Sequence, residues 1–154
     1  MCATYLASIF LFPFFFAQKV LSPKKNTFAS FVSICILSTI FYTIALSIRD
    51  LELANRILHV LGGGFLGFFV CFIATRNSGV SINKFQFFVF SALIVLALGI
   101  GNELLEFLLQ NRFNIISAKT ASDTWFDLAS NVVGIILAGV CFVPFHKKPA
   151  LDHI

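Results

Sequence analysis

The sequence has little charge. Only 12% of its 154 residues are charged, whereas 58% are hydrophobic, 21 are phenylalanine and the mean hydropathy is +0.94. A chain of this composition lacks the polar side chains that cover a water-soluble domain, so lipid must cover much of its exterior. Disordered, collagen-like and nucleic-acid-binding proteins are disfavoured by the same composition.

Paired cysteine spacings and the residue pattern of a cleavable signal peptide are also missing. Cys35, Cys71 and Cys141 lie inside apolar runs, Cys2 stands near the start, and no C-x-x-C spacing occurs. These cysteines therefore predict small core residues rather than a disulfide framework. No basic region precedes the first apolar stretch and no convincing cleavage site follows it, so we expect the first segment to be retained.

Five apolar runs dominate what is present, and each is about as long as a helix that crosses the hydrocarbon core. They lie near residues 2–18, 27–48, 57–75, 85–110 and 124–145. The first run is short and contains Pro13, so a tilted or re-entrant segment is the alternative there. The sequence predicts an all-α polytopic transmembrane helix bundle of about five spans, in a single domain over 1–154.

The basic residues predict an orientation. If the N-terminus is outside, seven lie on the cytoplasmic side: Lys19, Lys24, Lys25, Arg76, Lys84, Lys147 and Lys148. The other four lie outside: Arg49, Arg56, Arg112 and Lys119. This bias favours an outer N-terminus and, with an odd number of spans, a cytoplasmic C-terminus.

The acidic residues gather at the predicted outer side. Six of the seven lie there or in helix ends that face it: Asp50, Glu52, Glu103, Glu106, Asp123 and Asp127. Ionisable groups inside apolar runs are costly unless they are paired or face a wet interior, and they commonly mark functional sites. The distribution therefore points to a polar site at this surface.

Helical spacing allows these residues to meet. Glu103 and Glu106 share one stripe of the fourth run, and Asp123, Asp127 and Asn131 share one stripe of the fifth. The start of the third run, the end of the fourth and the start of the fifth must lie at the same membrane surface. We expect the following residues to form a ligand-binding site: Arg56, His59, Glu103, Glu106, Arg112, Asp123, Asp127 and Asn131.

Several carboxylates in a poorly hydrated site cannot all be charged without compensation. Either one is protonated, or Arg56, Arg112, His59 or a metal neutralises them. A divalent metal such as Mn, Fe or Zn would suit these ligand types, with His59, Glu103, Glu106 and Asp127 as the candidate ligands. The Glu-x-x-His pair of di-iron bundles is absent. Alternatively, polar side chains such as Asn102, Ser130 and Asn131 only hydrogen-bond between helices.

Two other features predict packing and anchoring. The glycines at 62, 63, 64 and 67 include a Gly-x-x-x-Gly pair, which favours close approach of another backbone. The offsets of a phosphate-binding loop are missing around them. Trp125 lies near the predicted outer interface, where we expect it to anchor the protein in the headgroup region.

Three motifs between about residues 55 and 139 resemble those of the VanZ-like family of small bacterial membrane proteins. Asn55 to His59 is similar to the Asp-Lys-x-x-His of that family, with Asn55 in place of the acid. Glu103-x-x-Glu106 departs from the family's Glu-x-x-Gln at its second acid. Asp127-x-x-x-Asn131-x-x-Gly134 matches the third motif, and Arg112 matches an arginine of the preceding loop.

The resemblance implies a multi-pass protein of the bacterial inner membrane, in a cell-envelope family with members linked to resistance against teicoplanin-type glycopeptides. It does not imply a reaction. Three functions remain open. The first is binding of a lipid or lipid-linked ligand at the outward-facing site. The second is a small intramembrane enzyme acting on a lipid or polyprenyl carrier, with His59, Glu103 and Asp127 as candidate catalytic residues. The third is a structural or proton-relay subunit, which would require oligomerisation or partner subunits.

Overall fold

The described part of the chain is helical throughout. The computed structural model describes residues 27–78, 80–113 and 121–146, and it has no strand within these ranges. Its elements are α2 (Thr27–Leu46), α3 (Leu51–Leu58), the π-helix η1 (His59–Phe65), α4 (Leu66–Ser78), α5 (Lys84–Phe113), α6 (Ala121–Phe142) and the 3₁₀ turn η2 (Val143–Phe145). The all-α class is confirmed.

Three helices are long and apolar enough to cross a membrane: Leu51–Arg76, Lys84–Phe113 and Ser122–Phe145. The predicted span near 27–48 forms α2, but the apolar helix assigned there, Ser30–Leu46, is shorter than the other three. The predicted span near 2–18 lies outside the described residues. A membrane bundle is therefore supported, whereas the count of about five spans is not confirmed.

The third apolar run was predicted to begin near residue 57, with a connection before it, but in the structure the helix already begins at Leu51. The helix begins at Leu51 because Asp50 caps it: Oδ1 of Asp50 accepts hydrogen bonds from the backbone N–H groups of Glu52 (2.9 Å) and Leu53 (3.2 Å). Arg56 is consequently a helical residue with a fixed direction. The prediction of a loop at residues 51–56 was wrong because it was based on where the apolar run begins and not on the capping residue Asp50.

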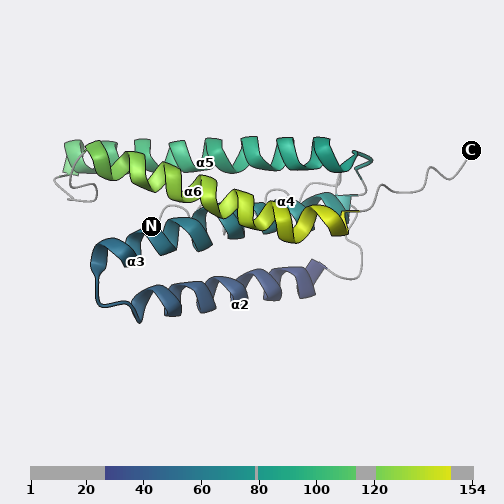
Figure 1. The fold of residues 1–154 in the computed structure, drawn as a ribbon, viewed down its shortest axis with the longest axis horizontal. Helices are drawn as coiled ribbons and strands as arrows, with labels where there is room; N and C mark the ends of the chain where they lie inside the picture. Colours follow the sequence, from purple (N-terminus) through teal and green to yellow (C-terminus); the bar gives the residue numbers. More distant parts are fainter. Residues whose placement is uncertain (1–26, 79, 114–120, 147–154) are drawn as a thin grey trace, which may run out of the picture.

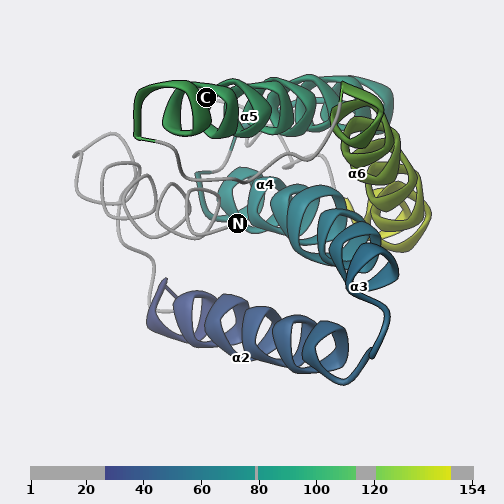
Figure 2. The same cartoon turned by 90° about the vertical axis from the view of Figure 1, so that its left-hand side faces the viewer.

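The helices form layers around one long central helix (Figures 1 and 2). Segments α3, η1 and α4 run on from one another, with α2 on one side and α5 on the opposite side. Helix α6 lies beside both η1 and α5, and its contact with η1 is the most extensive in the bundle. This antiparallel course brings the start of α3, the end of α5 and the start of α6 to one end of the molecule.

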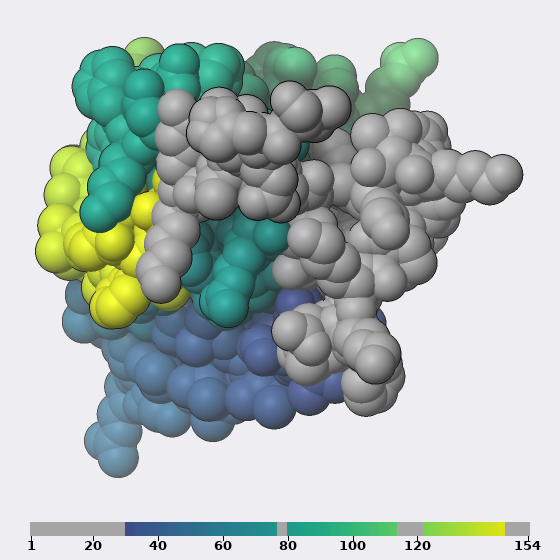
Figure 3. Space-filling view, turned by 90° about the vertical axis from the view of Figure 1, so that its right-hand side faces the viewer, coloured from purple at the N-terminus to yellow at the C-terminus, as the bar shows by residue number. Residues whose placement is uncertain are grey.

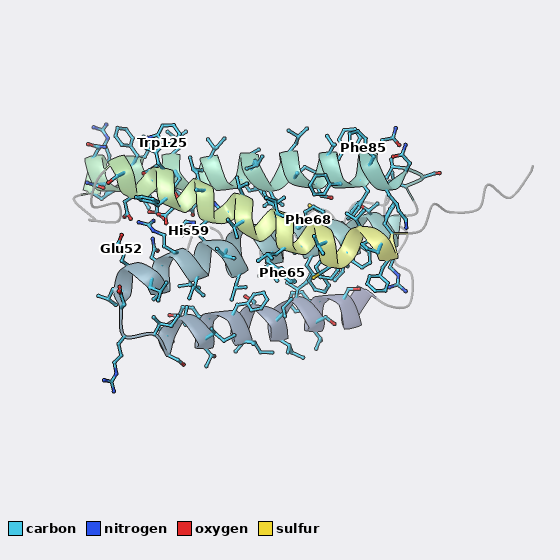
Figure 4. All side chains as sticks on the ribbon, viewed as in Figure 1. Glu52, His59, Phe65, Phe68, Phe85 and Trp125 are labelled. Carbon is cyan, nitrogen blue, oxygen red and sulfur yellow. The ribbon has the colours of Figure 1, made fainter. Side chains whose placement is uncertain are left out.

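The apolar core lies nearer the other end of the bundle. Phe68 and Phe87 are fully buried, and their rings meet edge to face with centroids 5.4 Å apart. Phe65 and Phe68 mark this region in Figure 4. Many other large apolar side chains are exposed, among them Leu104, Phe107 and Val140 on α5 and α6. Such exposure suits a surface covered by lipid rather than water.

Two glycines explain the close contact between η1 and α6. A Cβ atom added to Gly64 would lie 2.2 Å from the Asn131 carbonyl oxygen and 2.7 Å from the Gly134 Cα. One added to Gly134 would lie 2.0 Å from the Val60 carbonyl oxygen. The two backbones can approach this closely only because neither position carries a side chain. Gly64 of η1 and Gly134 of α6 therefore form a glycine contact between two helices.

A substitution within the glycine run tests this packing. Gly64→Ala should lower the free energy of unfolding by about 1–3 kcal/mol, because its methyl group overlaps backbone atoms that cannot move independently. Gly62→Ala is the matched control, since a Cβ at Gly62 meets nothing within 4 Å. Unfolding in mixed detergent and SDS, followed by circular dichroism, measures both. Equal stability of the two variants would contradict the proposed contact.

Candidate functional site

Polar side chains from three segments meet at the end of the bundle where α3 begins, α5 ends and α6 begins. The central helix contributes Arg56 and His59, α5 contributes Glu103 and Glu106, and α6 contributes Asp127 and its neighbours. Figure 4 shows His59 directed toward α6, with Glu52 nearer the end of the bundle. The buried members are His59, Asn102, Glu103, Glu106, Asp127 and Asn131.

Arg56 bridges two carboxylates on α6. Its Nη1 donates to Oδ1 of Asp127 and its Nη2 donates to Oδ1 of Asp123. Nη1 also donates to the Asp123 carbonyl oxygen at 3.1 Å. The guanidinium carbon lies 5.2 Å from the centre of the Phe126 ring, which favours the cation further. Arg56 is thus engaged with α6 on several sides, and its side chain is only 17% exposed.

Asp127 receives its contacts on one oxygen. Besides Arg56, the Nδ2 of Asn55 donates to Oδ1 at 2.9 Å, and the Nε2 of His59 lies 3.5 Å from the same atom. Among the residues that the structure describes, no hydrogen bond or ion pair uses Oδ2. One carboxylate oxygen of a side chain that is only 3% exposed is therefore open to a further partner.

Glu103 is a buried acid of the cluster whose carboxylate lacks hydrogen bonds. Its side chain is buried, and neither carboxylate oxygen has a hydrogen-bond partner within the described ranges. Asn102 and Thr124 lie close enough to affect it electrostatically, but they do not bond it with normal geometry. A buried carboxylate without a partner is costly unless it is protonated or meets a cation.

His59, Glu103 and Asp127 together form a group that can hold a metal ion. One ligand atom of each lies within 4.8 Å of those of the other two, and all three residues are buried. His59 is the first residue of the π-helix η1. Such π-helical turns occur often at functional sites, where they change the direction of a side chain.

Glu106 lies on the same side of α5 and is also buried. The Nδ2 of Asn102 donates to Oε1 of Glu106 at 2.9 Å, one turn away on the same helix. Ser130 likewise donates to the carbonyl of Phe126 within α6 at 2.8 Å. These described hydrogen bonds of Asn102 and Ser130 act within a helix, where the sequence analysis expected bonds between helices.

Asn131 occupies a gap between two glycines. A Cβ added to Gly63 would lie 2.1 Å from its Oδ1, and one added to Gly99 would lie 2.8 Å from its Nδ2. The side chain is 2% exposed and its Oδ1 has no partner in the described part of the chain. Glycines on η1 and α5 therefore make room for an α6 amide beside His59.

Arg112 does not join the cluster. It lies nine residues after Glu103, which at about 100° per residue places it on the opposite side of α5. Its side chain is exposed, and within the described ranges it has no ion pair. The other seven residues of the predicted set lie together, whereas Arg112 was expected there from its place near a loop, before its helical direction was known.

Asn55 is a site residue that the sequence analysis missed. It was noted only as a replacement for an acid, yet it donates to Asp127 from the central helix. The signal was its spacing: Asn55 and His59 are four residues apart, so they share a helical face once the helix is extended back to Leu51.

Comparisons with known proteins support the membrane assignment. A family model described as a predicted membrane protein (DUF2238) matches residues 2–148. Comparisons with curated proteins and with solved structures gave no match. The matching model is not that of the VanZ-like family, so the resemblance to that family remains a prediction.

The contribution of the Arg56 bridge to stability can be measured with Arg112, at the same end of the bundle, as the control. Arg56→Gln should lower the free energy of unfolding by about 1–3 kcal/mol, because two carboxylates on α6 lose their cation. The loss should be smaller than the roughly 3–5 kcal/mol of a fully buried pair, since Arg56 retains some solvent contact. Arg112→Gln, at an exposed position, should change stability by less than about 0.5 kcal/mol. A similar loss in both variants, measured by SDS titration, would show that the bridge adds no stability.

Proposed function

We propose that this chain, which belongs to the DUF2238 family of predicted membrane proteins, binds a divalent metal ion between His59, Glu103 and Asp127. The ion in turn holds the headgroup of a lipid or lipid-linked ligand at one membrane surface. One observation carries the proposal: three buried side chains of metal-ligating types, each from a different helix, present ligand atoms within 4.8 Å of one another.

The charge balance favours a cation over a directly bound anion. Among the described residues at this end, the acids Glu103, Glu106, Asp123 and Asp127 lie together with one arginine in the cluster, and Asp123 and Asp127 already engage that arginine, Arg56. A phosphate entering this cluster alone would meet an excess of carboxylates. A divalent cation removes that excess, satisfies Glu103 and supplies the positive charge that a headgroup phosphate needs.

The donor set suits a transition metal. One imidazole nitrogen and two carboxylate oxygens are ligands that Zn²⁺, Mn²⁺ and Fe²⁺ share, whereas Ca²⁺ and Mg²⁺ favour oxygen alone. Bonds of about 2.0–2.2 Å place two ligands of one zinc ion at most about 4.4 Å apart. Small rotamer changes would therefore bring the three groups, now within 4.8 Å, onto one ion.

The surrounding residues would hold the ligands in place. Asn55 and Arg56 bond Oδ1 of Asp127, so Oδ2 is directed away from them and is available. Asn131 lies beside the His59 ring. Such outer partners commonly orient metal ligands and raise metal affinity.

The second candidate function is an enzyme, and it is favoured by the number of protein ligands that the proposed metal ion would have. Three protein ligands leave at least one coordination position open, as in catalytic zinc sites. A lipid phosphate bound there would be polarised by the ion, and the neighbouring Glu106 could act as general base toward an attacking water. In this version His59, Glu103 and Asp127 are the ligands, and the substrate is a phospholipid or a polyprenyl carrier.

The relay hypothesis has less support. The buried polar cluster lies at one end, and the central helix continues into a core that includes Leu66, Phe68 and Val95. Apolar side chains of this kind do not carry protons. An outward-facing site in a bacterial inner membrane and a link to glycopeptide resistance remain parts of the proposal that rest on the basic-residue bias and the VanZ-like resemblance.

Metal binding is tested by titration of the purified protein. In detergent and after chelator treatment, the full chain should bind one Zn²⁺ or Mn²⁺ ion and unfold at a higher temperature when the ion is present. Glu103→Gln and His59→Gln should each weaken binding by at least about 10-fold, because each removes a ligand.

Glu52→Gln is the matched control for these variants. It removes the same charge at the same end of the bundle, but the Glu52 side chain is 74% exposed and lies outside the ligand group. It should bind metal as the wild type does. If calorimetry showed no stoichiometric ion, or if Glu103→Gln bound like Glu52→Gln, the metal site would be wrong.

A second experiment distinguishes the two candidate functions, lipid binding and lipid-modifying catalysis. Metal-loaded wild type should retain a polyprenyl phosphate at least about 10-fold better than Glu103→Gln does. Diacylglycerol, which lacks a phosphate, should be retained equally by wild type and Glu103→Gln. Mass spectrometry of the lipid then reports turnover. Retention without product supports the first candidate, and product formation that stops with chelator supports the second. Equal retention by wild type and Glu103→Gln would contradict both.

A further inference from the structure

A second candidate site lies at the end of the bundle opposite the polar cluster. There an open groove of about 450 Å³ runs between the start of α5 and the end of α6. It is lined by Phe88, Ile136, Gly139, Val140, Val143 and Pro144. The volume falls within the range of about 300–1,000 Å³ typical of ligand pockets, and the lining is almost entirely apolar. Figure 3 shows this end, with α6 in yellow beside α5 in teal.

The walls of this groove are held together by specific contacts. The Nε2 of His146, just after α6, lies 3.0 Å from the Ile82 carbonyl oxygen, and its ring stacks on Phe87 with centroids 4.5 Å apart. Asn83 and Gln86 cap the start of α5 reciprocally, at 2.8 and 3.0 Å. The two helix ends that form the groove are therefore fixed relative to each other.

A lysine stands at one end of the groove. The Nζ of Lys84 donates to the carbonyl oxygen of Pro144, a lining residue, at 3.0 Å. Its side chain is exposed, and among the described residues it has no ion pair. An ammonium group has three donors, so this one retains donors for a further acceptor. An apolar groove that ends at an unpaired cation matches an apolar chain that ends in an anion.

We propose that this groove binds an anionic phospholipid, with an acyl chain along Ile136, Val140 and Val143 and the headgroup phosphate on Lys84. Charge complementarity selects the occupant. A helix from a second copy would fill the apolar part and leave the ammonium unpaired, whereas a phospholipid satisfies both parts. The site is independent of the metal ligands, which lie at the other end of the bundle.

Native mass spectrometry of the full chain in detergent tests this site. With EDTA present to exclude the metal site, the wild type should retain phosphatidylglycerol at least about 10-fold better than phosphatidylcholine. Lys84→Gln should lose this preference, and Lys84→Arg should keep it. Val140→Phe should lose both lipids, because the new ring lies in the groove. Val140 is 73% exposed, so this change should leave the fold intact.

Two controls match these variants. Arg76→Gln removes a cation at the end of α4, and Val133→Phe adds a ring to an exposed position of α6 outside the groove. Both should retain phosphatidylglycerol as the wild type does. The proposal fails if Lys84→Gln keeps the preference, if Arg76→Gln loses it equally, or if Val140→Phe abolishes a dimer while lipid retention is unchanged.

Discussion

The bridge from Arg56 to Asp123 and Asp127 is the interaction on which the polar end of this bundle depends. It joins the central helix to α6, and it places one positive charge between the two carboxylates of Asp123 and Asp127. Because the guanidinium and Asn55 both use Oδ1 of Asp127, the remaining oxygen is left for a partner inside the cluster. The bridge therefore stabilises the fold but does not reach the deeper acid Glu103, whose carboxylate oxygens have no hydrogen-bond partner within the described residues.

Backbone geometry sets how close the remaining groups come. The π-helix begins at His59, and the glycines that follow allow α6 to approach until Gly64 and Gly134 touch. Asn131 then fits between Gly63 and Gly99, at the junction of η1, α5 and α6. Larger residues at these positions would move α6 away and carry Asp127 with it. The geometry of the site thus depends on these glycines as much as on the charged side chains.

The sequence predicted the cluster well where helical period and topology were sufficient. Glu103, Glu106, Asp127 and Asn131 lie one or two turns apart along their helices, and alternating spans must return to the same surface. Arg112 was misplaced because a residue nine positions along a helix faces the opposite way. The early start at Leu51 was missed although Asp50 is a strong N-cap. The π-helix was not predicted, since π-helical turns are rare and the helical period of the apolar run does not distinguish them from an α-helix.

The two ends of the molecule differ in chemistry, and this difference bears on its orientation. Within the described residues, one end buries Glu103, Glu106 and Asp127 near the partly buried Arg56, which pairs with Asp123 and Asp127. The other end exposes Lys84 and Arg76, and the Lys84 ammonium donates to the Pro144 carbonyl oxygen. Exposed cations attract the anionic cytoplasmic leaflet, whereas a buried and paired arginine does not. The two ends therefore present different groups to a lipid surface: exposed cations at one end, and acids packed around a partly buried arginine at the other.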